Sequence, residues 1–243
     1  MGRVTSGELK STNGTVDWDG AGMLRVRYDG SAAGLSKLAG SLRTRLGRRT
    51  VPVEALRAVE VSQDALAFRL ILRDQADPLQ AVTGGYFDAL IDPYSFPLAV
   101  DDLPLAERLA TDIRVTLARR DVPTTAAVRW LVAPPVAPDE IEGRDATVSV
   151  SSGRLVFAYK RTAGRKKRAN GDPWSVPLAD IVDVEWLPNQ GWFGNRGFLR
   201  ISTARTPLER PKPRHDPAAM LTERRADVDA LFFAARLLTR IRP

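Results

Sequence analysis

The sequence contains no cysteine among its 243 residues. That absence excludes disulfide bonds, thiol catalysis, iron–sulfur clusters and cysteine-ligated zinc. It is consistent with a reducing compartment. The N-terminus has no apolar run of signal-peptide length, and no stretch approaches the ~18 consecutive apolar residues of a membrane-spanning helix. We therefore expect a soluble, cytoplasmic protein.

Histidine is almost as scarce, since the only one is His215, between Arg214 and Asp216 in a proline-rich stretch. No defined nucleophile stands beside it, and no phosphate-binding loop, dinucleotide fingerprint or zinc pattern occurs. Carboxylate pairs such as Asp183 and Glu185 are explained more simply as strand-surface residues. We expect no catalytic residue, no metal site and no cofactor, and predict that the protein is not an enzyme.

Basic residues outnumber acidic ones, with 36 Lys and Arg against 29 Asp and Glu and a formal net charge of +7. Arg far exceeds Lys, and Ala, Val and Leu are abundant, which is the composition expected of a GC-rich genome. The Arg content alone is therefore no sign of function. A net charge of this size permits an anionic partner without requiring one.

An internal repeat organises the chain. β-Hairpins are predicted at 15–28 and 147–159, because β-branched residues near period-2 alternation flank a glycine-containing turn in both. The segment 51–61 then matches 176–186, with valine, proline, valine and glutamate at identical places. The order of these matches, more than any one of them, predicts a duplication.

The repeat continues to the end of each half. A strand candidate at 66–72 faces one at 197–202, and we matched the Asp-Pro pairs at Asp77 and Asp216 that follow them. Both halves then end in apolar residues at helical spacing. The stripes are Leu105, Leu109, Ile113 and Leu117 in the first half, and Val228, Leu231, Phe232, Ala235 and Leu238 in the second.

Between the halves lies a proline-rich stretch, 122–142, that can continue neither a helix nor a central strand. A semi-rigid linker is the natural interpretation. We therefore predict a first domain at 1–121, a linker at 122–142 and a second domain at 143–243.

Each half runs hairpin, variable loop, strand, hairpin, extended segment, helix. An antiparallel β-roll or split barrel closed by the C-terminal helix satisfies this order and buries every apolar face in one core. We expect an α+β protein of two such domains in tandem. This is the ground plan of pleckstrin-homology-like (PH-like) domains.

Several short motifs stand out, namely Gly14-Thr15-Val16 with the hairpin at 24–28, and the segments 68–70, 76–79, 92–96 and 176–186. They resemble an uncharacterised actinobacterial family known only as domain of unknown function 4429, whose members often carry such a unit twice. The resemblance covers nearly the whole chain apart from the linker, and its motifs are structural rather than catalytic. It implies a PH-like tandem and an actinobacterial origin, with no assigned activity.

Two basic loops occupy matching places, between the first hairpin and the Val-Pro strand of each half. Neither 31–53 nor 160–168 contains an acidic residue, so each loop holds a positive potential that phosphates, phosphorylated lipid headgroups or nucleic acid backbones would neutralise. The alternative is a solvated loop in an Arg-rich protein. The candidate anion contacts are Lys160, Arg161, Arg165, Lys166, Lys167 and Arg168 in the second half, and Arg43, Arg45, Arg48 and Arg49 in the first.

Two further features concern contact surfaces. Leucines at 35, 38, 42 and 46 fall on one helical face and predict a short helix ending at Gly47, packed on its own domain or lying on an anionic membrane. Trp192 and Phe193 are adjacent in a glycine-rich turn, where at least one is expected to be exposed as a partner contact. An aromatic tucked under the hairpin is the alternative.

These observations favour a non-catalytic tandem interaction module that binds a protein partner or an anionic surface through the basic loops. Nucleic acid binding through the same loops is the alternative, although no helix-turn-helix or RNA-binding signature occurs. An enzyme using carboxylates between the two halves has no positive support. The oligomeric state stays open.

Overall fold

The computed structural model describes residues 6–85, 87, 91–189, 197–207, 209–223 and 227–242. The chain forms two compact units. Unit 1 contains Met1–Asp77 and Gly85–Ala133, and unit 2 contains Pro78–Gly84 and Pro134–Pro243. Each unit is described below by itself.

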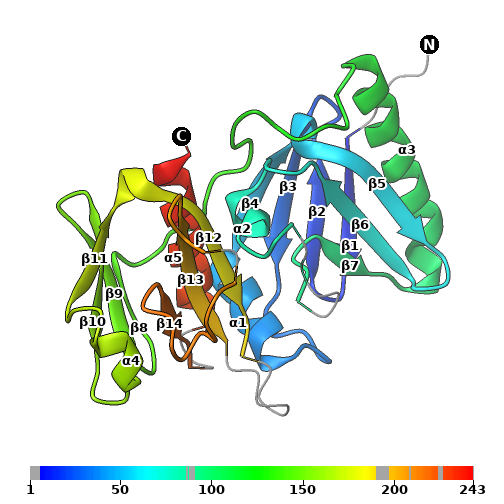
Figure 1. Cartoon of the computed structure of the whole chain (residues 1–243). Helices are drawn as coiled ribbons and strands as arrows, with labels where there is room; N and C mark the ends of the chain where they lie inside the picture. The colour runs from blue at the N-terminus through cyan, green and yellow to red at the C-terminus, as the bar shows by residue number, and fades with distance from the viewer. Residues whose placement is uncertain are drawn as a thin grey trace. The chain divides into compact units, whose positions relative to one another are not determined.

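Unit 1 holds two antiparallel sheets, one of four strands in the order β1-β2-β3-β4 and one of three in the order β5-β6-β7 (Figure 1). Hydrophobic residues alternate along the strands, so that one face of each sheet reaches the core. The strands are β1 (Gly7–Ser11), β2 (Gly14–Trp18), β3 (Met23–Tyr28), β4 (Arg48–Pro52), β5 (Leu56–Ser62), β6 (Ala67–Leu72) and β7 (Ser95–Pro97).

Helix α3 (Leu103–Arg119) packs on β5 and closes the core of unit 1 (Figure 1). Its predicted stripe is confirmed in the middle, where Leu109 and Ile113 are buried, while Leu105 and Leu117 at the two ends are only half-buried. A spacing of four residues drifts by about 40° per step around a helix of 3.6 residues per turn, so the ends of such a stripe leave the buried face. The short 3₁₀ turn η2 (Val100–Asp102) leads into this helix.

The leucine-bearing loop of unit 1 forms α1 (Lys37–Leu46), as predicted. The Ser36 hydroxyl accepts a hydrogen bond from the Ala39 amide at 3.2 Å, and Gly47 ends the helix with a φ of 55°. Gly40 lies against the backbone of Gly30, where a Cβ atom would come within 2.7 Å of the carbonyl oxygen. The glycine inside the helix therefore permits a close approach of the chain.

Unit 2 repeats the arrangement, with sheets in the orders β11-β10-β9-β8 and β12-β13-β14 and a closing helix, α5 (Asp227–Ile241) (Figure 1). The predicted stripe of this helix is confirmed, since Val228, Leu231 and Leu238 are all buried. The strands are β8 (Glu140–Glu142), β9 (Ala146–Ser151), β10 (Arg154–Tyr159), β11 (Trp174–Pro177), β12 (Ile181–Leu187), β13 (Phe198–Thr203) and β14 (Ala219–Leu221).

Unit 2 also includes the segment Pro78–Gly84, which comes from the first half of the sequence. Its short helix α2 (Pro78–Ala81) packs against α5, and the Val82 carbonyl accepts a hydrogen bond from the Trp186 amide at 2.8 Å. The chain therefore passes through the second unit once before completing the first.

The N-terminal part of the proline-rich stretch lies along unit 1. The Ala127 amide donates to the Asp74 carbonyl at 2.7 Å, and the Leu131 and Val132 amides both donate to Ala76. Val132 is buried in the core of unit 1. Residues up to Ala133 therefore form part of unit 1 rather than a free tether.

The matched Val-Pro segments mark the point where the chain changes sheets. Pro52 and Pro177 end β4 and β11, and each is followed by a 3₁₀ turn, η1 (Val53–Ala55) or η3 (Leu178–Asp180), before the first strand of the three-stranded sheet. Proline has no amide to continue a ladder and fixes φ, which suits this corner. Both following strands then carry a register shift at their second residue.

The structure bears out the α+β class, the antiparallel sheets and the repeated element order, but the strands form separate sheets and not a closed barrel. The predicted match between Asp77 and Asp216 is wrong. Arg69 and Arg200 hold equivalent positions opposite β7 and β14, and each forms an ion pair with the aspartate that precedes that strand, Asp92 or Asp216. Asp216 therefore corresponds to Asp92 rather than to Asp77, because the connection in unit 1 contains a second Asp-Pro pair.

Candidate anion-binding face

The basic loop of unit 2 is fixed by one buried lysine. It forms the single-turn helix α4 (Arg165–Arg168), in which the side chain of Lys167 is 0% exposed. Its Nζ lies 2.5 Å from Oδ2 of Asp145 and donates to the Ala219 carbonyl at 2.8 Å. Burial lowers the pKa of Lys167, and the charge of Asp145 opposes that shift. Lys167 thus connects the loop to Asp145, which precedes β9, and to β14.

The neighbours of this anchor face solvent. Arg165, Lys166 and Arg168 are all exposed, because a single helical turn that points one side chain inward directs the others away. None of the three forms an ion pair with a residue that the structure describes. Three cations are therefore held next to one another on a loop whose position is set from inside the core.

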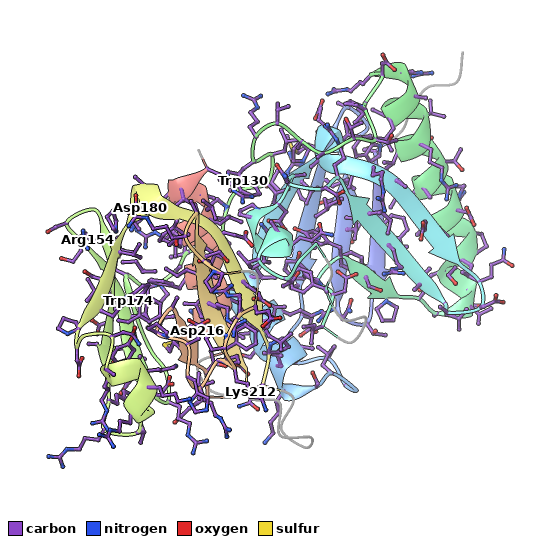
Figure 2. The ribbon with its side chains drawn as sticks, in the orientation of Figure 1. Trp130, Arg154, Trp174, Asp180, Lys212 and Asp216 are labelled. Atoms are coloured by element: carbon purple, nitrogen blue, oxygen red, sulfur yellow. The ribbon has the colours of Figure 1, made fainter. Side chains whose placement is uncertain are left out.

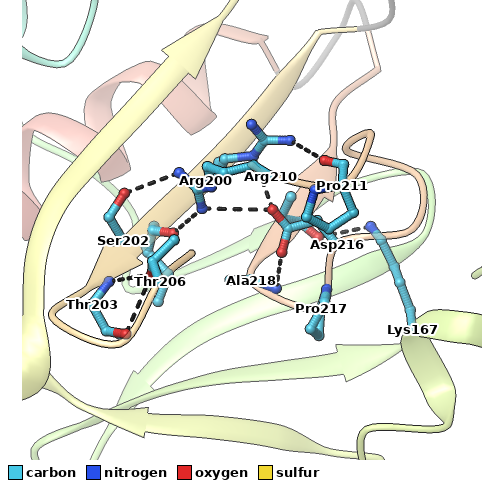
Figure 3. A network of polar contacts seen from close by, with 12 residues as sticks. Lys167, Arg200, Ser202, Thr203, Thr206, Arg210, Pro211, Asp216, Pro217 and Ala218 are labelled. Carbon is cyan, nitrogen blue, oxygen red and sulfur yellow. Dashed lines mark hydrogen bonds and ion pairs between the residues drawn. The ribbon is translucent and has the colours of Figure 1, made fainter. Parts of the chain in front are cut away.

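A second segment of unit 2, the connection between β13 and β14, is fixed by a buried carboxylate (Figure 3). Asp216 is 4% exposed and forms ion pairs with Arg200 at 3.1 Å and Arg210 at 3.5 Å. Arg200 also donates to the Pro211 carbonyl at 2.9 Å, and Arg210 donates to the Ser202 hydroxyl at 2.9 Å. The ion pairs of Asp216 with Arg200 and Arg210 therefore hold the connection in one conformation, although it contains no long element of secondary structure.

The fixed connection carries three more basic side chains at its turn. The His215 amide donates to the Lys212 carbonyl at 2.7 Å, and the Arg214 Nε donates to His215 Nε2 at 3.0 Å. Gly164, which precedes α4, lies beside this turn, and a Cβ atom there would come within 3.0 Å of the Arg214 carbonyl oxygen. The two loops are therefore in close contact, although almost 50 residues of sequence separate them.

The electrostatics of His215 reflect that contact. Its pKa is lowered from the ordinary value of 6.5, first by desolvation and then by the positive charges of Arg214, Lys166, Lys167 and Lys212. The positive charges of both loops therefore lower the pKa of the same side chain. We call the following side chains, all exposed except the half-buried His215, the basic face of unit 2, and Figure 2 labels Lys212 within it. The basic face consists of Arg165, Lys166, Arg168, Lys212, Arg214 and His215.

The other two candidates in this loop have different surroundings. Lys160 is half-buried, with its Nζ 2.5 Å from Glu142 and donating to the Gly143 carbonyl at 2.7 Å. Its charge is thus already partly neutralised. Arg161 is exposed. Because its charge is partly neutralised by Glu142, Lys160 is left out of the basic face.

The first-half candidates divide in the same way. Arg49 is buried and forms a bidentate pair with Asp77, with both N–O distances at 2.8 Å, and also donates to the Tyr94 hydroxyl at 2.6 Å. Arg43 is 2% exposed and donates to the Asp92 carbonyl at 2.8 Å. Arg45 and Arg48 are exposed. Buried cations cannot reach a ligand in solvent, so Arg43, Arg49 and Lys167 are corrected from surface contacts to internal anchors.

The two aromatic candidates, Trp192 and Phe193, lie outside the described residues. Lys212 and Arg214 are not among the residues predicted from the sequence, and His215 is predicted there only as a weak catalytic candidate. The signal that could have found them is their place in the repeat. They lie a few residues before β14, in a stretch rich in basic residues and proline. The loop that contains them contacts the α4 loop.

Chemistry other than charge has little basis in the described part of the chain. No group of three or more His, Asp or Glu side chains is placed to hold a metal ion among the residues that the structure describes. Over the same residues, no helix is both long and apolar enough to cross a membrane.

Comparisons with known proteins agree with the repeat. A family model matches the chain twice, over residues 34–114 and 148–238, once in each half. No curated protein and no solved structure is significantly similar to the chain. The two matched regions cover more than half of the sequence, and the chain therefore belongs to the family described as Domain of unknown function (DUF4429).

Proposed function

We propose that the chain is a non-catalytic, cytoplasmic tandem PH-like interaction module from an actinobacterium, and that unit 2 binds a phosphate-bearing anionic surface through its basic face. The PH-like assignment is supported by a four-stranded and a three-stranded antiparallel sheet followed by one closing helix, present twice. The origin is supported by the composition and by the family resemblance.

The single observation that carries the binding proposal is the close contact of two separately anchored basic loops, where Gly164 lies against Arg214 and cations of both loops surround His215. Like charges repel, so a chance excess of arginine would be expected to spread over the surface. Here, buried ion pairs at Asp145 and Asp216 hold the loops in place. Anionic oxygens that bridge the loops would relieve the repulsion by charge-assisted hydrogen bonds.

Sedimentation with vesicles tests the proposal. Phosphatidylcholine vesicles that contain phosphatidylserine or a phosphorylated inositol lipid should bring the full-length protein down, whereas pure phosphatidylcholine should not. Because a cation at an anionic membrane contributes about 1 kcal/mol, replacing Lys166 and Arg214 by Ala should weaken binding by roughly 30-fold.

The matched control is the double variant Arg57→Ala/Arg129→Ala, which removes the same charge from exposed positions of unit 1. It should bind almost as the native protein does. Equal losses in both variants, or no sedimentation of the native protein, would refute the proposal. Binding to a nonspecific DNA duplex with a steep salt dependence, lost in the Lys166/Arg214 variant, would establish the nucleic-acid alternative instead.

A further inference from the structure

A groove in unit 2 lies between the edge strand β8 and the closing helix α5. It has a volume of about 490 Å³ and is lined by residues of both elements. We call it the β8 groove. Among the residues that the structure describes, its charged lining consists of Glu140, Glu142, Glu223, Asp229 and Lys160. Four carboxylates against one ammonium give a formal charge of −3 (four minus one), in a chain whose net charge is +7.

The strand at this groove has an open edge. β8 is the last strand of its sheet and pairs with β9 alone. The backbone groups that point away from β9 belong to Glu140 and Glu142, and they form no backbone hydrogen bond to any residue that the structure describes. Unpaired strand edges are templates for the addition of another strand. The β8 groove thus combines unused backbone hydrogen-bonding groups with negative charge.

The spacing of the two strand carboxylates matches what an added strand would present. Ile141 is 3% exposed and points into the core, so Glu140 and Glu142 lie on the opposite face, two residues apart. Side chains directly across a strand pair come within about 5 Å of each other. A strand that carries basic residues at alternate positions would therefore pair with both glutamates.

Unit 1 has a groove in the equivalent place, which provides a comparison within the same chain. About 590 Å³ in volume, it lies between β1 and α3, and its lining includes Glu8 and Glu107. Both of these carboxylates are engaged, Glu8 with Arg27 at 3.0 Å and Glu107 with Arg114 at 3.6 Å. In the β8 groove, Glu142 is paired with Lys160, whereas Glu140 and Glu223 form no ion pair within the described residues.

We propose that the β8 groove binds an extended peptide segment of a partner protein that carries Arg or Lys at alternate positions and adds to the edge of β8. The backbone edge supplies affinity, and the carboxylates of Glu140 and Glu223, which form no ion pair within the described residues, select positive side chains. The surface is separate in chemistry from the basic face, since it attracts cations rather than anions. The protein would then connect an anionic surface to a basic partner segment.

Fluorescence anisotropy with a labelled Thr-Arg-Val-Arg-Val-Thr peptide and the full-length protein tests the inference. The peptide should bind, and a version with Glu in place of both Arg should not. Methylating the backbone nitrogens of the two Arg residues should abolish binding, because in antiparallel strand addition the residues opposite Glu140 and Glu142 are the ones whose amides donate to β8. The variant Glu140→Gln/Glu223→Gln should weaken binding by about three- to thirtyfold, the range for two surface charge pairs.

The control variant Glu60→Gln/Asp64→Asn removes two exposed carboxylates from unit 1 and should leave affinity unchanged. No binding of the Arg peptide would overturn the inference, and the glutamates would then serve only to block edge-to-edge association. Equal binding of the N-methylated peptide would overturn it too, because attraction would then be a matter of charge alone. Both results leave the vesicle experiment unaffected, since that experiment reports on the basic face.

Discussion

Replacing Lys167 by Met should destabilise unit 2 severely while leaving unit 1 intact. The lysine side chain is 0% exposed and its partner Asp145 is 2% exposed. Methionine fills a similar volume but leaves the buried Asp145 carboxylate without its counter-charge, and the Ala219 carbonyl loses its donor. Breaking a buried pair from one side in this way costs about 3–5 kcal/mol.

Urea unfolding of the full-length chain, followed by tryptophan fluorescence, measures that cost. With a urea dependence of roughly 2 kcal/mol per molar for a domain of this size, the midpoint of the unit 2 transition should fall by about 2 M. Trp174 and Trp186 report on unit 2, and Trp18 reports on unit 1. The unit 1 transition should not move.

Two further variants decide whether the charge pair is the cause. Arg168→Ala, one residue away and exposed, should change stability by no more than about 0.5 kcal/mol. Adding Asp145→Asn to Lys167→Met should restore part of the loss, because the uncompensated charge is removed. A loss below 1 kcal/mol for Lys167→Met, or a double variant less stable than the single one, would refute the anchoring role of the pair.

Two other predictions follow from buried and exposed charge. Arg49→Met should lower the stability of unit 1 by about 3–5 kcal/mol in the same urea assay, because Asp77 is 0% exposed and would lose its bidentate partner; an unmoved unit 1 transition would contradict this. Anionic vesicle binding should strengthen as pH falls. The pKa of His215 is below 6.5 in the free protein, and a bound anion raises it, so binding takes up a proton; pH-independent binding, or the same pH dependence in His215→Ala, would contradict this.

The sequence predicts the scaffold well because the scaffold is built from local patterns. Hairpins, the Val-Pro corners and the apolar stripes each depend on neighbouring residues, and the repeat allows each half to support the other. Helix α1 is a good example, since Leu42, Leu46 and the Gly47 cap lie where the leucine spacing predicts them, although the helix begins after Leu35. By contrast, the placement of Pro78–Gly84 in unit 2 depends on contacts with α5 that lie far away in sequence.

The candidate site is predicted only in part, for a physical reason. A run such as Arg165 to Arg168 has the same composition whether its members face solvent or the core, and what separates them is a partner distant in the sequence. Asp145 lies more than 20 residues before Lys167 and selects that lysine alone for burial. In the same way, Asp216 fixes the turn that brings Arg214 to the basic face, which no local pattern of charge reveals.

The most direct test of the basic face uses the only histidine of the chain as a probe. The pKa of His215 can be measured by NMR from the imidazole resonances of the full-length protein, first alone and then with added inorganic phosphate. We predict a pKa below 6.5 in the free protein that rises as phosphate binds, with no rise in the Lys166→Ala/Arg214→Ala variant. A pKa that stays unchanged at high phosphate concentration would contradict the proposal that this face binds anions.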